Sequence, residues 1–96
     1  MRRLLSVVVS VYNEEEALTQ FYQVTEGILK TISWDYELVF VNDGSRDQSL
    51  SILNRLADSN PKVKVVSFSR NFGHEAAMIA GIDYSQGDGI ICMDAD

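Results

Sequence analysis

Residues 4–16 read LLSVVVSVYNEEE, an apolar, β-branched run that ends abruptly in polar and acidic residues. A nearly continuous apolar stretch of this length predicts a strand over residues 4–11 that is covered on both faces, as in a parallel sheet. The residues after it predict a helix start, with Asn13 as the capping residue and Glu16 at the reciprocal position of a capping box. Apolar residues then recur at helical spacing, which predicts a helix to about Thr31.

The same alternation of strand and helix continues along the rest of the sequence. Further strands are predicted at 36–41, 63–68 and 89–93. Ser45 and Gln48 form a second capping box, and small residues in the third helix should let it pack closely on a sheet. This alternation predicts an α/β fold, a Rossmann-like parallel sheet with helices on both faces and the strand order 3-2-1-4.

The composition is that of an ordinary folded domain of 96 residues with a net charge of −6. Such an acidic chain does not offer the broad basic surface that binds nucleic acid, so no nucleic-acid partner is expected. The apolar neighbours of the single cysteine, Cys92, favour a buried structural thiol. The sequence shows no secretory leader and no run of about 20 apolar residues, so we expect a cytoplasmic location.

Polar residues gather directly after each predicted strand. The clusters are Tyr12-Asn13-Glu14, Asn42-Asp43-Gly44-Ser45, Ser69-Arg70-Asn71 and Asp94-Ala95-Asp96. Because the carboxyl ends of parallel strands share one edge, these clusters should surround a ligand crevice where the strand order reverses. Simpler interpretations of the first three stay open: a helix cap, a turn and a solvated charge. His74 lies beside the same edge, and there we favour a packed or solvated imidazole over a catalytic or metal-binding one.

Asp94 and Asp96 stand one residue apart, directly after a strand that is predicted to be buried. Two carboxylates so placed repel each other, and a hard cation between them removes the repulsion. Mg²⁺ or Mn²⁺ takes carboxylate oxygens and keeps positions for water and phosphate oxygens. We therefore expect Asp94 and Asp96 to be metal ligands; a solvated pair is the alternative.

Several familiar ligand motifs are missing from the sequence. It contains no Gly-x-Gly-x-x-Gly dinucleotide fingerprint, no P-loop, and neither Cys-x-x-Cys nor His-Glu-x-x-His. The segment after the third predicted strand, Ser69-Arg70-Asn71, also lacks the aspartate that a phosphorylated receiver domain needs there.

Three ordered segments resemble the family 2 glycosyltransferases of the GT-A fold. They are 7–15 (VVVSVYNEE), 41–47 (VNDGSRD) and 94–96 (DAD), the last resembling the Asp-x-Asp motif of that family. Residues 69–74 (SRNFGH) are similar to the branch that loads a sugar onto a polyprenyl phosphate. Ser10 departs from the proline that the family usually has, and we expect it to loosen the end of its strand.

The resemblance implies a role for each candidate residue. Tyr12 and Glu14 would line the nucleotide pocket, and Asp43 would accept hydrogen bonds from the base. Arg70 would contact the base or the phosphates. Asp94 would face the ribose or the metal, and Asp96 would hold the Mg²⁺ or Mn²⁺ that bridges the diphosphate.

For the whole protein, the resemblance implies an inverting, metal-dependent transfer from a UDP- or GDP-sugar to an acceptor such as a polyprenyl phosphate. Residues 1–96 would be the nucleotide-binding part of a longer enzyme, associated with the inner face of the membrane, and would lack the catalytic base. One further hypothesis is a nucleotide- and metal-binding unit without activity, and another is a structural piece that binds no ligand. A strand at the sheet edge also predicts self-association of the chain.

Overall fold

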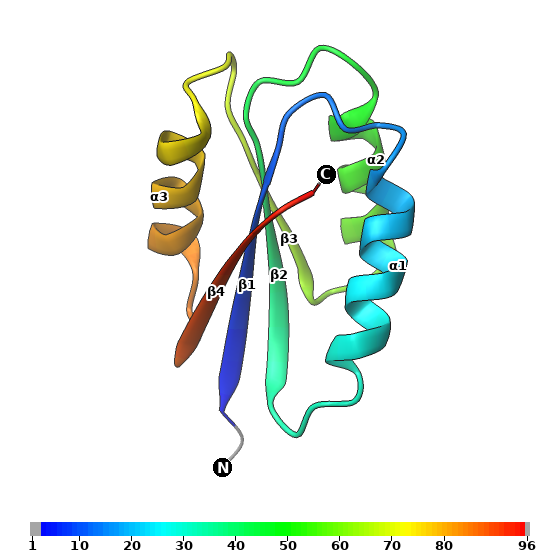
Figure 1. Cartoon of the computed structure of the whole chain (residues 1–96), viewed down its shortest axis with the longest axis vertical. Helices are drawn as coiled ribbons and strands as arrows, with labels where there is room; N and C mark the ends of the chain where they lie inside the picture. Colours follow the sequence, from blue (N-terminus) through cyan, green and yellow to red (C-terminus); the bar gives the residue numbers. More distant parts are fainter. Residues whose placement is uncertain (1–2, 96) are drawn as a thin grey trace.

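The structure, a computed structural model that describes residues 3–95, places one parallel sheet between helices on both faces (Figure 1). Along the chain the elements are β1 (Leu4–Val11), α1 (Leu18–Leu29), β2 (Asp35–Asn42), α2 (Ser49–Ser59), β3 (Val63–Ser67), α3 (His74–Tyr84) and β4 (Gly89–Asp94). The strand order is β3-β2-β1-β4 and all neighbours are parallel, which confirms the predicted fold class and order. None of the helices in the described residues has the length and apolarity that crossing a bilayer requires.

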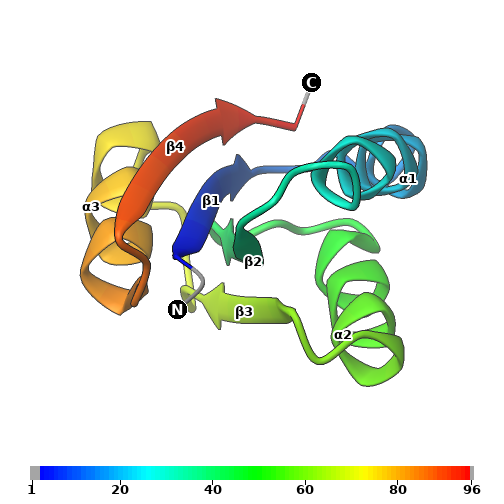
Figure 2. The ribbon, with the colours of Figure 1, turned by 90° about the horizontal axis from the view of Figure 1, so that it is seen from below.

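The two faces of the sheet are covered by different helices. Figure 2 shows α1 and α2 together on one side of the strands and α3 on the other. Successive side chains of a strand point to opposite faces, so Val7 and Val9 join the larger core under α1 and α2, whereas Val8 joins the smaller core under α3. The apolar run of β1 is therefore buried on both sides, as the sequence predicted.

Gly81 lets α3 lie close on the sheet. A Cβ at this position would overlap Cγ1 of Val8 and crowd Cγ2 of Val41. Ala77 is also buried in this contact, so the small residues of the helix act as predicted. The first residue of α3, His74, lies at the carboxyl edge of the strands.

Both predicted capping boxes are wrong. α1 begins at Leu18 and α2 at Ser49, later than predicted, and neither helix has a side-chain cap. Asn13 has a φ of +51°, outside the extended range of a capping residue, and its Oδ1 accepts the N–H of Arg46 at 2.8 Å. Ser45 Oγ in turn accepts the N–H of Asn13 at 3.0 Å. Asn13 and Ser45 therefore join the loop that follows β1 to the loop that follows β2 and do not cap their own helices.

β4 is an edge strand with largely exposed side chains, contrary to the predicted buried strand. It pairs with β1 along one side, while α3 packs over β1 and β2. Ile90 is 43% exposed, Ile91 is 48% exposed and Cys92 is exposed as well. The prediction of a buried thiol at Cys92 is wrong because an apolar sequence cannot reveal whether another element covers it.

Candidate functional site

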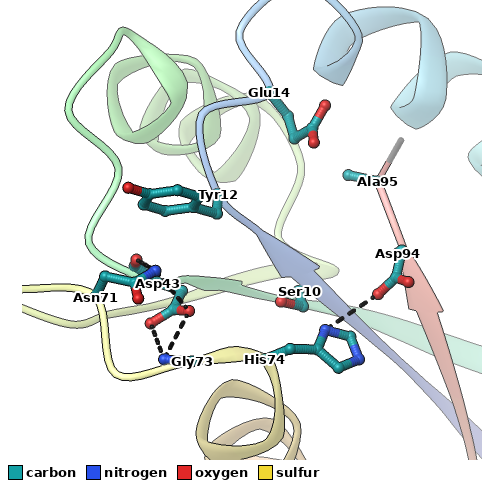
Figure 3. Close-up of a pocket in the computed structure, with 9 residues that line it drawn as sticks. All are labelled: Ser10, Tyr12, Glu14, Asp43, Asn71, Gly73, His74, Asp94 and Ala95. Carbon is teal, nitrogen blue, oxygen red and sulfur yellow. Dashed lines mark hydrogen bonds and ion pairs between the residues drawn. The ribbon is translucent and has the colours of Figure 1, made fainter.

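A cavity of about 370 Å³ opens at the carboxyl ends of β1, β2 and β4 (Figure 3). It is lined by Ser10, Tyr12, Glu14, Asp43, Asn71, Gly73, His74, Asp94 and Ala95. All four of the predicted polar clusters contribute to this lining. The strand order reverses between β1 and β4, and open α/β sheets bind ligands in the crevice at such a point.

β1 enters the cavity as a regular strand. Ser10 pairs with Val41 on one side and with Asp94 on the other, so it does not loosen the strand end as predicted. The regular pairing fixes the position along the edge from which Tyr12 and Asp94 extend into the cavity.

Asp43 anchors the loop that forms one wall of the cavity. Its side chain is buried, with the residue only 2% exposed. Its Oδ1 accepts the N–H of Phe72 at 2.8 Å, and its Oδ2 accepts the Asn71 side-chain amide and the Gly73 N–H, both at 3.1 Å. These three donors tie the end of β2 to the loop between β3 and α3. They leave about one of the roughly four lone-pair positions of the carboxylate for a ligand.

Gly44 allows the same two loops to touch. Its φ is +69°, and a Cβ there would collide with the backbone of Arg70 and Asn71. Glycine is the residue that meets both demands, since it tolerates positive φ and occupies no side-chain volume. The Asn-Asp-Gly-Ser segment is thus a turn and also one half of a loop–loop contact.

The loop between β1 and α1 is held in place by the loop that follows β2. The N–H of Glu14 donates to Ser49 Oγ at 2.9 Å, and the N–H of Glu15 donates to Asp47 Oδ2 at 3.1 Å. Burial alone would raise the pKa of Asp47, but the hydrogen bonds from Ser49 and Glu15 outweigh it and lower that pKa. This loop presents Glu14 and Tyr12, a residue that is 43% exposed, to the cavity.

The far side of the cavity is formed by His74 and Asp94. The Nδ1 atom of His74 lies 3.4 Å from Oδ1 of Asp94, and both side chains are more than half exposed. His74 is therefore accessible to solvent, as one of the two favoured interpretations held. Its contact with Asp94 was not predicted, because the two residues are far apart in the sequence and only the fold brings α3 and β4 together here.

The predicted site residues do not all lie in the cavity. Tyr12, Glu14, Asp43 and Asp94 line it. Arg70 does not belong to the lining, and its guanidinium lies 4.7 Å from the ring centroid of Phe72, on the loop that Asp43 anchors. Asp96 lies outside the described residues 3–95. Asn71 belonged to a predicted cluster, but nothing in the sequence indicated that its amide would bond to Asp43.

The cavity is acidic, and its donor atoms suit a hard cation. Within residues 3–95, no three Asp, Glu, His or Cys side chains come together as a complete metal cage. The exposed carboxylate of Asp94 nevertheless supplies oxygen ligands, and Mg²⁺ is commonly bound by one or two carboxylates together with water and substrate phosphates. These residues fit a cation that is shared with a bound phosphate group.

The fold and the crevice define a doubly wound α/β domain whose cavity lies at the switch point of the sheet, where domains of this class bind their ligands. The sequence profile described as glycosyl transferase family 2 matches residues 6–96, and the chain belongs to this family. The resemblance found in the three sequence motifs is thereby confirmed.

The chain is similar to several named proteins. It is 48% identical over 91 residues to the uncharacterized glycosyltransferase YkcC of Bacillus subtilis (strain 168), covering 95% of this chain and 28% of that protein. It is 49% identical over 92 residues to the prophage bactoprenol glucosyl transferase homolog of Escherichia coli (strain K12), covering 96% and 30%. The chain therefore spans less than a third of these relatives.

The fold also matches solved structures. S. aureus TarS 1-349 superposes with a TM-score of 0.80 and 25% identity over all of this chain and 28% of that one, and it has also been solved in complex with UDP-GlcNAc. The mannosyltransferase PcManGT from Pyrobaculum calidifontis, solved with GDP-Man and Mn²⁺, gives a TM-score of 0.79 at 23% identity, covering 100% and 28%. These matches confirm the predicted GT-A architecture.

Proposed function

We propose that the protein transfers a sugar from a nucleoside diphosphate sugar to a lipid phosphate, and that residues 1–96 form its donor-binding part. Membership of glycosyl transferase family 2 supports sugar transfer. The bactoprenol glucosyl transferases among the relatives support a polyprenyl phosphate acceptor. We further propose that the protein meets this acceptor at the inner face of the membrane. The observation that carries the donor site is the convergence of Tyr12, Glu14, Asp43 and Asp94 on one cavity.

Each residue has a place in the proposed donor site. The exposed ring of Tyr12 would stack on the base, and the remaining lone pair of Asp43 would accept a base N–H. Glu14 would accept a ribose hydroxyl. Arg70 would contact the base or the phosphates after its guanidinium leaves the ring of Phe72, which needs a change of rotamer.

Asp94 and Asp96 would hold Mg²⁺ or Mn²⁺ beside the diphosphate. When bound, the cation would neutralise the negative charge that develops on the departing nucleoside diphosphate. We propose one displacement with inversion, in which an acceptor oxygen bonds to the anomeric carbon as the bond from that carbon to the diphosphate oxygen breaks. The electron pair of the broken bond leaves with the diphosphate. No residue of this chain is assigned as the catalytic base.

A second candidate function for these 96 residues is nucleotide and cation binding without transfer. It is favoured by the extent of the match, since the chain covers 28% and 30% of two relatives named as glycosyltransferases. The two functions share the donor site and differ in whether the protein that carries these residues transfers a sugar. Incubation of the full-length protein with a labelled UDP- or GDP-sugar and a polyprenyl phosphate separates them, because only the first function produces a labelled lipid.

The donor site is tested by calorimetric titration of UDP and of GDP into the chain, with and without Mn²⁺. We expect one nucleotide to bind in a Mn²⁺-dependent way, and Asp94→Asn to weaken this binding by about tenfold or more. Tyr12→Ala should weaken binding both with and without the cation, since its proposed contact is with the base. Asp83→Asn, the same chemical change on the exposed surface of α3, is the control and should bind as the wild type does. Failure of both nucleotides to bind would contradict a donor site in this chain.

A further inference from the structure

His74 is the single histidine of the sequence and lies at the rim of the proposed donor site. It is the first residue of α3, and its ring is directed toward Asp94, the last residue of β4 (Figure 3). The separation of 3.4 Å between Nδ1 and Oδ1 is slightly longer than the ~2.7–2.9 Å of a charge-assisted hydrogen bond. A small rotation of either side chain would close this gap, as contacts in an empty site do when a ligand binds.

The backbone that carries His74 is fixed by Asp43, the residue that follows β2. The preceding residue, Gly73, has a φ of +106°, and its N–H donates to the buried carboxylate of Asp43. The N–H of Phe72 donates to the same carboxylate. Asp43 therefore sets where α3 begins, and with it the position of the imidazole.

Asp94 has less support of its own. It is the last residue of the edge strand β4, its side chain is 58% exposed, and its backbone pairs with Ser10 of β1. The Asp94 carboxylate contacts the imidazole of His74, with 3.4 Å between Oδ1 and Nδ1. An exposed carboxylate must lose rotational freedom when it binds a cation, which costs free energy.

We propose that His74 is a positioning residue that orients the Asp94 carboxylate for the cation and diphosphate of the donor, an inference that rests on the proposed function. The Nδ1–H group holds Oδ1 and leaves Oδ2 free to bind the cation. A partner that orients a metal-binding carboxylate or imidazole typically contributes about 10- to 100-fold to metal affinity. Through Gly73, this arrangement connects the Asn-Asp-Gly-Ser segment to the Asp-x-Asp motif on the other side of the cavity.

The first test measures Mn²⁺ affinity, with Mn²⁺ alone and with Mn²⁺ plus UDP or GDP, for three variants. His74→Ala should weaken Mn²⁺ binding by about tenfold. His74→Asn places an amide N–H near the position of Nδ1, so it should restore most of the affinity. Glu75→Gln, the next residue of the same helix turn, is the control and should be unchanged. Wild-type affinity in His74→Ala, or no rescue by His74→Asn, would overturn the proposal.

The second test needs no ligand and uses the fact that the chain has one histidine. Its imidazole C–H signals in an NMR spectrum should move in Asp94→Asn and stay in place in Asp83→Asn. Unmoved signals in Asp94→Asn would overturn the His74–Asp94 contact whether or not any nucleotide binds. If the wild type binds neither Mn²⁺ nor nucleotide, the proposed donor site is wrong. The NMR signals of His74 still show in that case whether its imidazole contacts Asp94.

Discussion

Replacement of Asp43 by asparagine should damage both the stability and the cavity of this domain. The carboxylate accepts hydrogen bonds from Phe72, Asn71 and Gly73 while 2% exposed. An amide keeps one oxygen, which can still accept the Phe72 N–H without the help of a charge, at a loss of about 1 kcal/mol. Its NH₂ group then faces the Asn71 and Gly73 donors, which keep only their longer contacts with the Asp43 carbonyl oxygen at 3.2 Å and with Oδ1 at 3.3 Å, and this loss costs about 1–3 kcal/mol more. The expected loss in the free energy of unfolding is therefore about 2–4 kcal/mol.

Urea unfolding followed by circular dichroism measures this loss. Asp83→Asn is the matched control, since it makes the same change at an exposed position and should stay within about 0.5 kcal/mol of the wild type. Nucleotide binding should fall as well, because the wall formed by residues 71–73 loses its anchor. An Asp43→Asn protein as stable as Asp83→Asn would refute the assignment of Asp43 as the structural link between the two loops.

Three further results are expected. Gly44→Ala should destabilise the chain by more than about 2 kcal/mol in urea unfolding, because the φ there is positive and a Cβ would overlap backbone atoms. Gly27→Ala is the matched control: a Cβ there meets open space, so it should stabilise α1 by about 0.5–1 kcal/mol. The lowered pKa of Asp47 means that the ionised carboxylate stabilises the fold fully above its usual pKa of 3.8, and that this contribution is lost as pH falls through the lowered value. In acid unfolding, the difference in stability between the wild type and Asp47→Asn should therefore disappear. Sedimentation should show self-association that Ile91→Lys abolishes, because β4 is an open edge with exposed apolar side chains; a monomeric wild type at high concentration would contradict this.

The sheet could be predicted from the sequence because its signals are local and repeated. The apolar run of β1 and the polar residues that end each strand mark where strands begin and stop, and the α/β alternation leaves few allowed topologies. The same logic placed Tyr12, Asp43 and Asp94 at one edge of the sheet, and the cavity contains all three.

What the sequence could not show depends on contacts between distant segments. Asn13 and Ser45 have the chemistry of helix caps, and only the spacing between two loops decides that they bond to each other instead. Cys92 has apolar neighbours along the chain, and only the packing of α3 decides that it is exposed. A residue type limits what a side chain can bond to, whereas the fold selects the partner.

This distinction also changes how the motifs of the chain act. Asp43 belongs to the segment that a nucleotide base would contact, yet three of its acceptor positions are used to hold the loop of residues 71–73. This loop leads into α3, whose first residue, His74, contacts Asp94. Asp94 belongs to the Asp-x-Asp motif, which we assign to the cation. The motifs are therefore not independent binding groups placed around a cavity. Each one sets the geometry of the next, so a substitution in one segment should alter ligand contacts that belong to another.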